Sequence, residues 1–177
     1  MANWTITSPP AAGYPPITAF SAVSTPAVPI GTIVTATDST TSTTTGAQGS
    51  GEFIYLAGVA STVAGSLVTY NPATGVTVLA PTTANKTTPF AVAMSANILA
   101  TTYGWYQISG VAAIAKTTIK VNPAVAIYVT GSGQITSTAA SGKQVTNAVS
   151  ANATTIASAT GTVLVTINRP GGWGSAT

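Results

Sequence analysis

Seven side chains in this sequence carry a charge at neutral pH, and any catalytic chemistry has to start from them. They are Asp38, Glu52, Lys86, Lys116, Lys120, Lys143 and Arg169. Histidine is absent, which removes the most common general base and metal ligand at neutral pH. Cysteine is also absent, so a thiolate nucleophile and disulfides are excluded. Ser-His-Asp and Cys-His catalytic arrangements are therefore impossible.

A pair of carboxylates is the remaining candidate for catalysis. Asp38 and Glu52 are the two acids, and glycosidases use two. Asp38 stands where an expected strand meets a Thr-rich loop, and Glu52 begins the next expected strand, so a structural role is the favoured interpretation over a hydrolase. Two acids without Asp-x-Asp spacing do not make a calcium site, and the Gly-rich segments 46–51 and 171–174 lack the residues of a phosphate loop. We expect no enzymatic activity, no metal and no cofactor.

The low charge content is the largest anomaly of the composition. Charged residues make up 4% of the 177 residues, against about a quarter in ordinary soluble domains. The polar surface has to come mainly from neutral groups, and the chain holds 34 threonines. A surface of this kind has little to oppose close association, so we expect much of it to be covered by identical copies or by a larger assembly.

The net charge of +3 comes from scattered residues rather than from a basic patch. No cluster of Lys or Arg with interleaved aromatic residues is present, so nucleic-acid binding is not expected. No run of about 20 apolar residues occurs, so no membrane span is expected. The N-terminus lacks a basic region followed by an apolar stretch, so no signal peptide is expected either.

Short β-branched or aromatic runs separated by turn signals recur along the chain and predict an all-β fold, a β-sandwich or β-barrel-like domain with an extended Pro-rich N-terminal arm. The Ala-rich segment 148–160 is open to a helical interpretation, but its Thr and Ser content disfavours it. Two Gly-Val-Ala motifs, each followed by an Asn-Pro turn, hint at an internal repeat: Gly58 to Pro72 and Gly110 to Pro123. The expected strands are residues 30–37, 52–56, 66–71, 76–79, 90–95, 104–109, 117–121, 126–130, 143–149 and 162–168.

The first 28 residues differ from the rest, because several prolines exclude helix there. Aromatic residues spaced between the prolines favour an extended arm that docks on a neighbour over a disordered segment. The chain is therefore divided into an arm over residues 1–28, a β-rich domain over residues 29–170 and a flexible C-terminal tail over residues 171–177. Residues 39–51 are expected to form a polar, exposed loop.

Six aromatic residues are the candidates for an interface: Trp4, Tyr14 and Phe20 in the arm, and Tyr103, Trp105 and Tyr106 in one strand. Strand geometry places Tyr103 and Trp105 on one face and Tyr106 on the other, so a continuous stacking platform for a sugar or a nucleic acid is disfavoured. The favoured interpretation is that Trp105 packs in the core, while the tyrosines cover its edge or meet a partner.

Two groups of motifs resemble a known family. Residues 29–34 (PIGTIV) and 51–59 (GEFIYLAGV), followed by residues 91–97 (AVAMSAN) and 103–110 (YGWYQISG), are similar to proteins encoded beside the major capsid protein of tailed bacteriophages, the capsid decoration or cement proteins. The C-terminal Asn168-Arg169-Pro170 also fits, and the resemblance covers roughly residues 29–170. It implies a non-catalytic β-rich protein, commonly a homotrimer, that binds the major capsid protein.

The same resemblance implies a location on the outer capsid surface of the virion, after synthesis in the cytoplasm of the bacterial host. Its implied role is to clamp neighbouring capsomers. Three alternatives stay open at this point: a tail-tube or fibre module, a carbohydrate-binding β-sandwich that uses Trp105, and the hydrolase built on Asp38 and Glu52.

Overall fold

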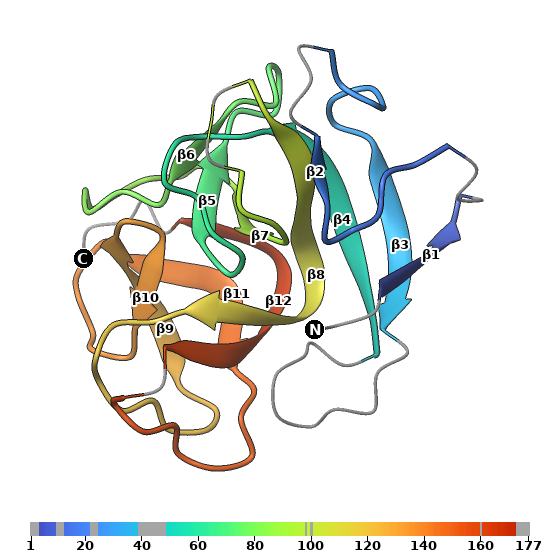
Figure 1. The fold of residues 1–177 in the computed structure, drawn as a ribbon. Helices are drawn as coiled ribbons and strands as arrows, with labels where there is room; N and C mark the ends of the chain where they lie inside the picture. The colour runs from blue at the N-terminus through green and yellow to red at the C-terminus, as the bar shows by residue number, and fades with distance from the viewer. Residues whose placement is uncertain are drawn as a thin grey trace.

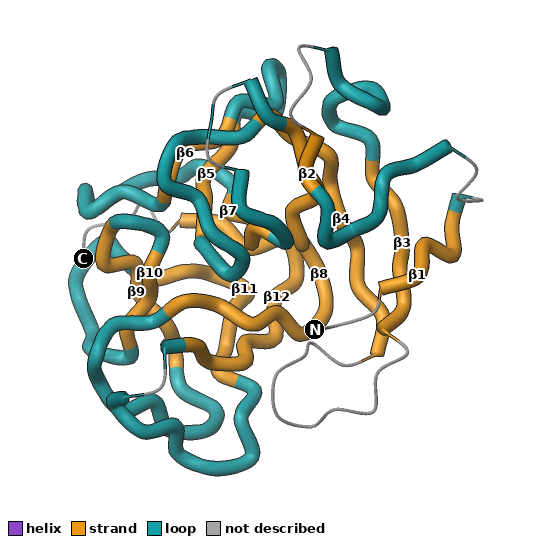
Figure 2. The backbone as a smooth tube through the Cα atoms, viewed as in Figure 1, coloured by secondary structure: helices purple, strands orange, loops and turns teal. Residues whose placement is uncertain are grey.

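The computed structural model describes residues 4–9, 13–21, 25–38, 49–97, 99, 101–159 and 161–172, and the regular structure in them is entirely β-strand (Figures 1 and 2). The all-β prediction is confirmed. The described part of the chain contains no helix long and apolar enough to cross a lipid bilayer. The strands are β1 (Trp4–Ser8), β2 (Phe20–Ser21), β3 (Ile33–Asp38), β4 (Gly49–Ala57), β5 (Leu67–Tyr70), β6 (Thr77–Leu79), β7 (Phe90–Ala93), β8 (Tyr103–Ala115), β9 (Ala126–Gly131), β10 (Gln134–Thr136), β11 (Gln144–Ser150) and β12 (Thr162–Gly172).

The long strand β8 is shared by two barrel-like units. In the first unit β8 pairs with β4 and β7, β7 pairs with β5, β5 pairs with β6, and a bridge from Val76 to Ala57 returns the ring to β4. In the second unit β8 pairs with β12, followed by β11, β9 and β10, and a bridge from Ile135 to Lys116 returns the ring to β8. Figure 1 shows β8 bending through the middle of the molecule from β4 towards β12.

The two units have the same connectivity, with strands β4 to β8 of the first corresponding to β8 to β12 of the second. The bridges that close the two rings, Ala57↔Val76 and Lys116↔Ile135, are both parallel. Each residue of the second bridge lies 59 positions after the corresponding residue of the first. Equivalent backbone hydrogen bonds join Ser66 to Ala93 in the first unit (2.9 Å) and Val125 to Ser150 in the second (3.0 Å). The fold is therefore an internal structural duplication.

Each unit encloses its own apolar core, because alternate residues of a strand point to the same face. On β8, Tyr106 and Ile108 point into the first unit, and Ala112 and Ile114 point into the second. The core of the second unit also receives Leu67 from the outer face of the first. This packing holds the two units together without a separate linker.

A third buried cluster lies on the opposite face of β3, β4 and β8, and the N-terminal segment contributes to it. Trp4, Ile17 and Val28 are buried there against Phe53 and Trp105. β1 extends the sheet by pairing with β3 in antiparallel register. The division at residue 28 stays a prediction, but the described residues of that segment pack on their own chain.

Most predicted strands are confirmed, with boundaries shifted by a few residues. Residues 117–121 were expected to form a strand and do not, since only Val121 forms an isolated bridge, with Ile156. β10 was not predicted, because its three residues, Gln-Ile-Thr, are too few to show the alternation of apolar and polar residues that is typical of a strand. The described residues of segment 148–160 form no helix.

The sequence motifs suggested two units but matched the wrong positions. Gly58 follows the end of β4, whereas Gly110 lies inside β8. Gly49 to Gly51 of the expected loop belong to β4, and the remainder, residues 39–48, lies outside the described residues. Likewise Gly171 and Gly172 of the expected tail belong to β12, and residues 173–177 lie outside the described residues.

Candidate interaction surface

Four of the six predicted interface residues meet in a single aromatic cluster on the face of β4 and β8. The Trp4 ring packs edge-on against Phe53 with centroids 4.8 Å apart. Trp105 packs edge-on against Tyr55 at 5.1 Å. The cluster is the aromatic core that joins the N-terminal segment to the sheet, and its members are Trp4, Tyr14, Phe53, Tyr55, Tyr103 and Trp105.

Trp105 is fully buried and its indole N–H donates a hydrogen bond to the carbonyl oxygen of Pro15 at 3.0 Å. Tyr14 covers the ring edge-on at a centroid distance of 6.2 Å. The prediction that Trp105 packs in the core is confirmed. Because this ring presents no surface to solvent, the structure does not favour the carbohydrate-binding alternative that depended on it.

Tyr106 points to the opposite face, as predicted, into the core of the first unit. Its hydroxyl oxygen accepts a hydrogen bond from the side-chain amide of Asn97 at 3.0 Å. Burial raises the pKa of Tyr106, and the hydrogen bond from Asn97 opposes this shift. Tyr106 is therefore a neutral core residue, and its use in an interface stays a prediction.

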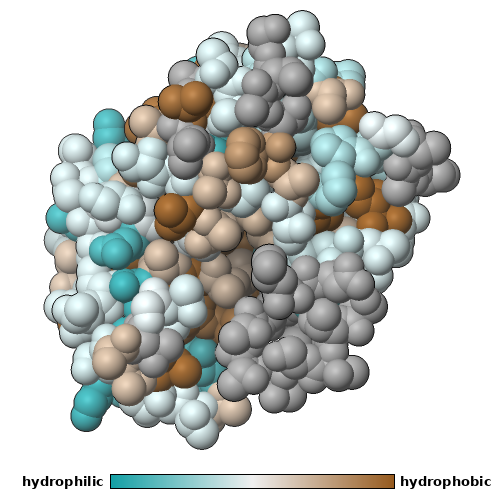
Figure 3. Space-filling view, viewed as in Figure 1, coloured by the Kyte–Doolittle hydropathy of each residue, from teal (hydrophilic) through white to brown (hydrophobic). Residues whose placement is uncertain are grey.

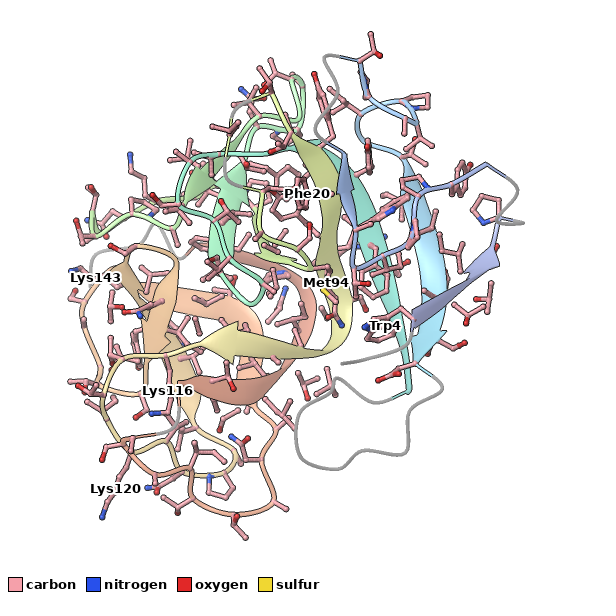
Figure 4. The ribbon with its side chains drawn as sticks, in the orientation of Figure 1. Trp4, Phe20, Met94, Lys116, Lys120 and Lys143 are labelled. Atoms are coloured by element: carbon pink, nitrogen blue, oxygen red, sulfur yellow. The ribbon has the colours of Figure 1, made fainter. Side chains whose placement is uncertain are left out.

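Phe20 is the predicted interface residue with the largest exposure, at 46%. Its backbone pairs with Gly104 of β8, which fixes the ring over the middle of the molecule. Figure 4 places Phe20 and the half-buried Met94 on the same face, above β8. The same face in Figure 3 shows apolar side chains around a shallow hollow between the two units.

A second apolar surface lies on the hairpin of β5 and β6. A shallow groove of about 630 Å³ opens there, between the hairpin and Thr88. Val76 and Val78, exposed at 51% and 55%, line it together with Tyr70 and Pro72. Burial raises the pKa of Tyr70, with a smaller opposing effect from Arg169, so its phenol stays protonated. The groove offers neutral, mostly apolar contacts with a hydroxyl-bearing rim.

No family model, curated protein or solved structure matches this chain. The resemblance carried by residues 29–170 therefore stays a prediction.

The two acids do not form a pair. Glu52 lies opposite Thr35 of β3, and Asp38 lies three positions further along β3, opposite Gly49. Because successive side chains of a strand alternate between its faces, an offset of three places the two carboxylates on opposite faces of the sheet. Glu52 instead accepts a hydrogen bond from Arg169 at 3.0 Å, which links β4 to β12 across β8. The described residues contain no group of three side chains suited to hold a metal ion.

Lys116 is a buried cation at the end of β8. Its ammonium group donates hydrogen bonds to the carbonyl oxygens of Thr117 (3.1 Å), Ile119 (2.8 Å) and Ser158 (3.2 Å). Burial lowers the pKa of Lys116. The three carbonyls tie the loop after β8 to the segment before β12, so the role of this lysine is structural.

Sequence reasoning did not single out Val76 and Val78, because alternating valines in a short strand read as ordinary core residues. Their exposure results from the position of β6 beside the groove, where one face of the strand has no covering layer. The sequence feature that could have indicated this exposure is the short length of the β-branched segment 76–79, which follows the Asn71-Pro72 turn.

Proposed function

We propose that this chain is a structural protein of a tailed-bacteriophage particle that binds the outer surface of the capsid and stabilises contacts between capsomers. Two independent lines support this proposal. The first is the resemblance of residues 29–170 to capsid decoration proteins. The second is the character of the surface, which suits permanent association with neutral protein partners.

The observation that carries the proposal is the set of large apolar side chains exposed on a charge-poor protein. Single exposed apolar side chains are normal in soluble proteins, but apolar side chains gathered on one surface, as Val76 and Val78 are beside the groove, mark a surface that associates. With seven charged residues in 177, few charges surround these side chains. The exposed residues are Phe20, Ile30, Ile33, Val63, Val76, Val78, Leu99 and Val149.

A decoration role requires contacts and no reaction. Each copy that binds the closed shell and not its dissociated parts lowers the free energy of the shell. Many weak contacts repeated over a symmetric lattice then add up to a large stabilisation. The proposed partner is the major capsid protein, and the proposed assembly is a homotrimer on the outer surface of the virion.

The test is addition of the purified chain to expanded, undecorated capsids built from the capsid protein encoded beside its gene. We expect co-sedimentation of the chain with these particles and a higher temperature of thermal rupture. Phe20→Asp weakens both effects, since a carboxylate would have to be desolvated in the contact. Thr166→Asp, on the exposed face of β12, is the matched control.

Failure of the chain to bind any form of the capsid would overturn the proposal. Labelling of the chain on the tail in electron micrographs of the particle would replace it with the tail-tube or fibre alternative.

A further inference from the structure

Among the described residues, β1 and the two-residue strand β2 each pair with a single other strand, and β1 is the longer of the two. It lies at one end of the strand order, and in the described part of the chain its backbone pairs with β3 alone. The other end of the order, β10, is bridged back to β8, and β6 is bridged back to β4. Figure 1 shows β1 at the right margin of the fold, beyond β3.

The open edge of β1 lacks the usual protection by charge. Edge strands in soluble proteins commonly carry lysine or another charged side chain, which blocks pairing with a second molecule. The exposed side chains of β1 are Thr5, Thr7 and Ser8, all of them neutral. The register with β3 shifts after Ile6, so the regular part of the strand is Trp4 to Ile6.

We propose that two copies of this chain associate through β1, with the strands antiparallel about a twofold axis at Thr5. In this register Thr5 lies opposite Thr5 of the partner subunit, and Trp4 lies opposite Ile6 of the partner subunit. Pairs of threonines and pairs of an aromatic with a β-branched residue are favourable across antiparallel strands. Trp4 belongs to the aromatic cluster and Ile6 packs against it, so the pairing joins the two clusters along one face of a continuous sheet.

A second copy fits this edge because the edge is complementary to itself. An antiparallel pair of identical strands is isologous, and it needs one free edge per subunit, which is what the topology supplies. No charged side chain of β1 would meet its own copy. The paired run is short, so the contact is weak for a single pair and is strengthened where many copies sit on one lattice. This twofold contact is separate from the threefold contacts of the proposed homotrimer, and it does not depend on the proposed capsid role.

Disulfide trapping tests the register directly. The chain has no cysteine, so Thr5→Cys introduces a single thiol. Side chains directly opposite each other on antiparallel strands have Cβ atoms about 4.5–5.5 Å apart. A disulfide bond needs about 3.5–4.5 Å, so a small shift of the paired strands lets the bond form. Thr166→Cys is the matched control, because Thr166 is also exposed but lies on β12, where β8 and β11 already occupy both edges.

Under mild oxidation we expect Thr5→Cys to form covalent dimers at least about tenfold faster than Thr166→Cys, because pairing raises the effective concentration of the two thiols. Equal rates for the two variants would overturn the proposal.

Sedimentation of the full chain gives an independent measurement. We expect concentration-dependent dimers that Thr5→Lys abolishes, since like charges directly opposite each other destabilise a strand pair, while Thr166→Lys leaves them unchanged. A wild-type chain that is monomeric at high concentration, with capsid binding lost in Thr5→Lys, would assign the edge to a strand of the shell and overturn the proposal. Absence of capsid binding in the wild type and in every variant, with the wild-type dimers intact, would overturn the proposed function alone.

Discussion

The indole N–H of Trp105 donates a hydrogen bond of 3.0 Å to the carbonyl oxygen of Pro15, which precedes it by 90 residues. This bond fixes the N-terminal segment over the centre of β8. Trp4 reaches the same aromatic cluster from β1, but its indole N–H is buried without a hydrogen-bond partner among the described residues. The two tryptophans therefore bury similar rings with different polar contacts.

Phenylalanine substitutions at Trp105 and Trp4 separate the contribution of the buried ring to stability from that of the hydrogen bond. Both substitutions replace an indole with a smaller phenyl ring. Trp105→Phe also removes the hydrogen bond to Pro15, whereas Trp4→Phe removes an indole N–H that has no partner among the described residues. We expect Trp105→Phe to lower the free energy of unfolding by about 1–3 kcal/mol more than Trp4→Phe, since the Pro15 carbonyl loses its partner. Chemical denaturation measures both values. Equal losses would mean that the bond to Pro15 contributes nothing.

Deletion of residues 1–28 is expected to destabilise the whole domain. Sequence reasoning alone predicts that the β-domain stays folded without this segment. The burial of Trp4, Ile17 and Val28 leads to the opposite expectation, because their removal exposes Phe53 and Trp105. Three buried side chains contribute about 5 kcal/mol or more, which is a large part of the stability of an ordinary domain.

Circular dichroism and thermal unfolding of the truncated chain check this prediction. A soluble, cooperatively folding fragment of residues 29–177 with unchanged thermal midpoint would contradict it and would support an arm that is independent of the domain.

The sequence predicted the class of fold because β-branched runs and turn signals act locally. It did not predict the spacing between the two units. Ser66 and Val125 occupy equivalent positions because their backbone carbonyl groups make equivalent hydrogen bonds, and any residue type can make such bonds. Nor did it predict that Trp4 and Ile17 pack on their own chain. A spaced aromatic pattern is the same whether the surface that receives it belongs to the chain or to a neighbour.

The interface candidates were predicted in part. Strand alternation placed Trp105 and Tyr106 on opposite faces correctly, since the period of two is a property of the backbone. Exposure could not be predicted in the same way, because it depends on which layers cover a face. Phe20 is exposed while Trp105 is buried, although each is an aromatic residue in an extended segment.

Gly110 and Arg169 occupy equivalent places in the two units and both have positive φ, at 100° and 46°. A Cβ atom on Gly110 would lie 2.6 Å from the carbonyl oxygen of Ser50. Gly110→Ala is therefore expected to lower the free energy of unfolding by about 2 kcal/mol or more, from the clash and the left-handed backbone together. Gly161→Ala is the control, because nothing lies within 4 Å of its added carbon.

Arg169 gives the complementary comparison. Arg169→Ala and Arg169→Gly both remove the ion pair with Glu52, but only glycine relieves the left-handed backbone. We expect the glycine variant to be more stable than the alanine variant by about 1 kcal/mol. An alanine variant as stable as the glycine variant would show that the backbone at this position is unstrained.

Lys116 is expected to stabilise the loop after β8 through its three carbonyl partners. Lys116→Met leaves the carbonyls of Thr117, Ile119 and Ser158 without their donor, which costs about 1–3 kcal/mol. Lys120→Met, at an exposed position, changes the free energy of unfolding little. Denaturant unfolding at neutral pH distinguishes the two, and a Lys116→Met variant as stable as the wild type would refute the structural role.

The pH dependence of this lysine has a definite sign. Because burial lowers the folded pKa of Lys116 below its usual 10.5, the unfolded chain binds more protons between the two values. The contribution of Lys116 to the free energy of unfolding therefore rises with pH between its folded pKa and 10.5. The wild type is expected to gain stability relative to Lys116→Met as the pH approaches 10.5.

Tyr106 is expected to act in the opposite direction at high pH. Burial raises its folded pKa above the usual 10.0, so between 10.0 and the folded value the folded state holds a proton that the unfolded state has lost. The contribution is complete below pH 10.0 and disappears as the pH rises through the folded pKa. Tyr106→Phe cannot ionise and removes this dependence, at the cost of leaving the Asn97 amide without its acceptor. Urea unfolding from pH 9 to pH 11 should therefore show a steeper loss of stability in the wild type than in Tyr106→Phe, and parallel curves would mean that the phenol ionises as readily in the folded chain as in the unfolded one.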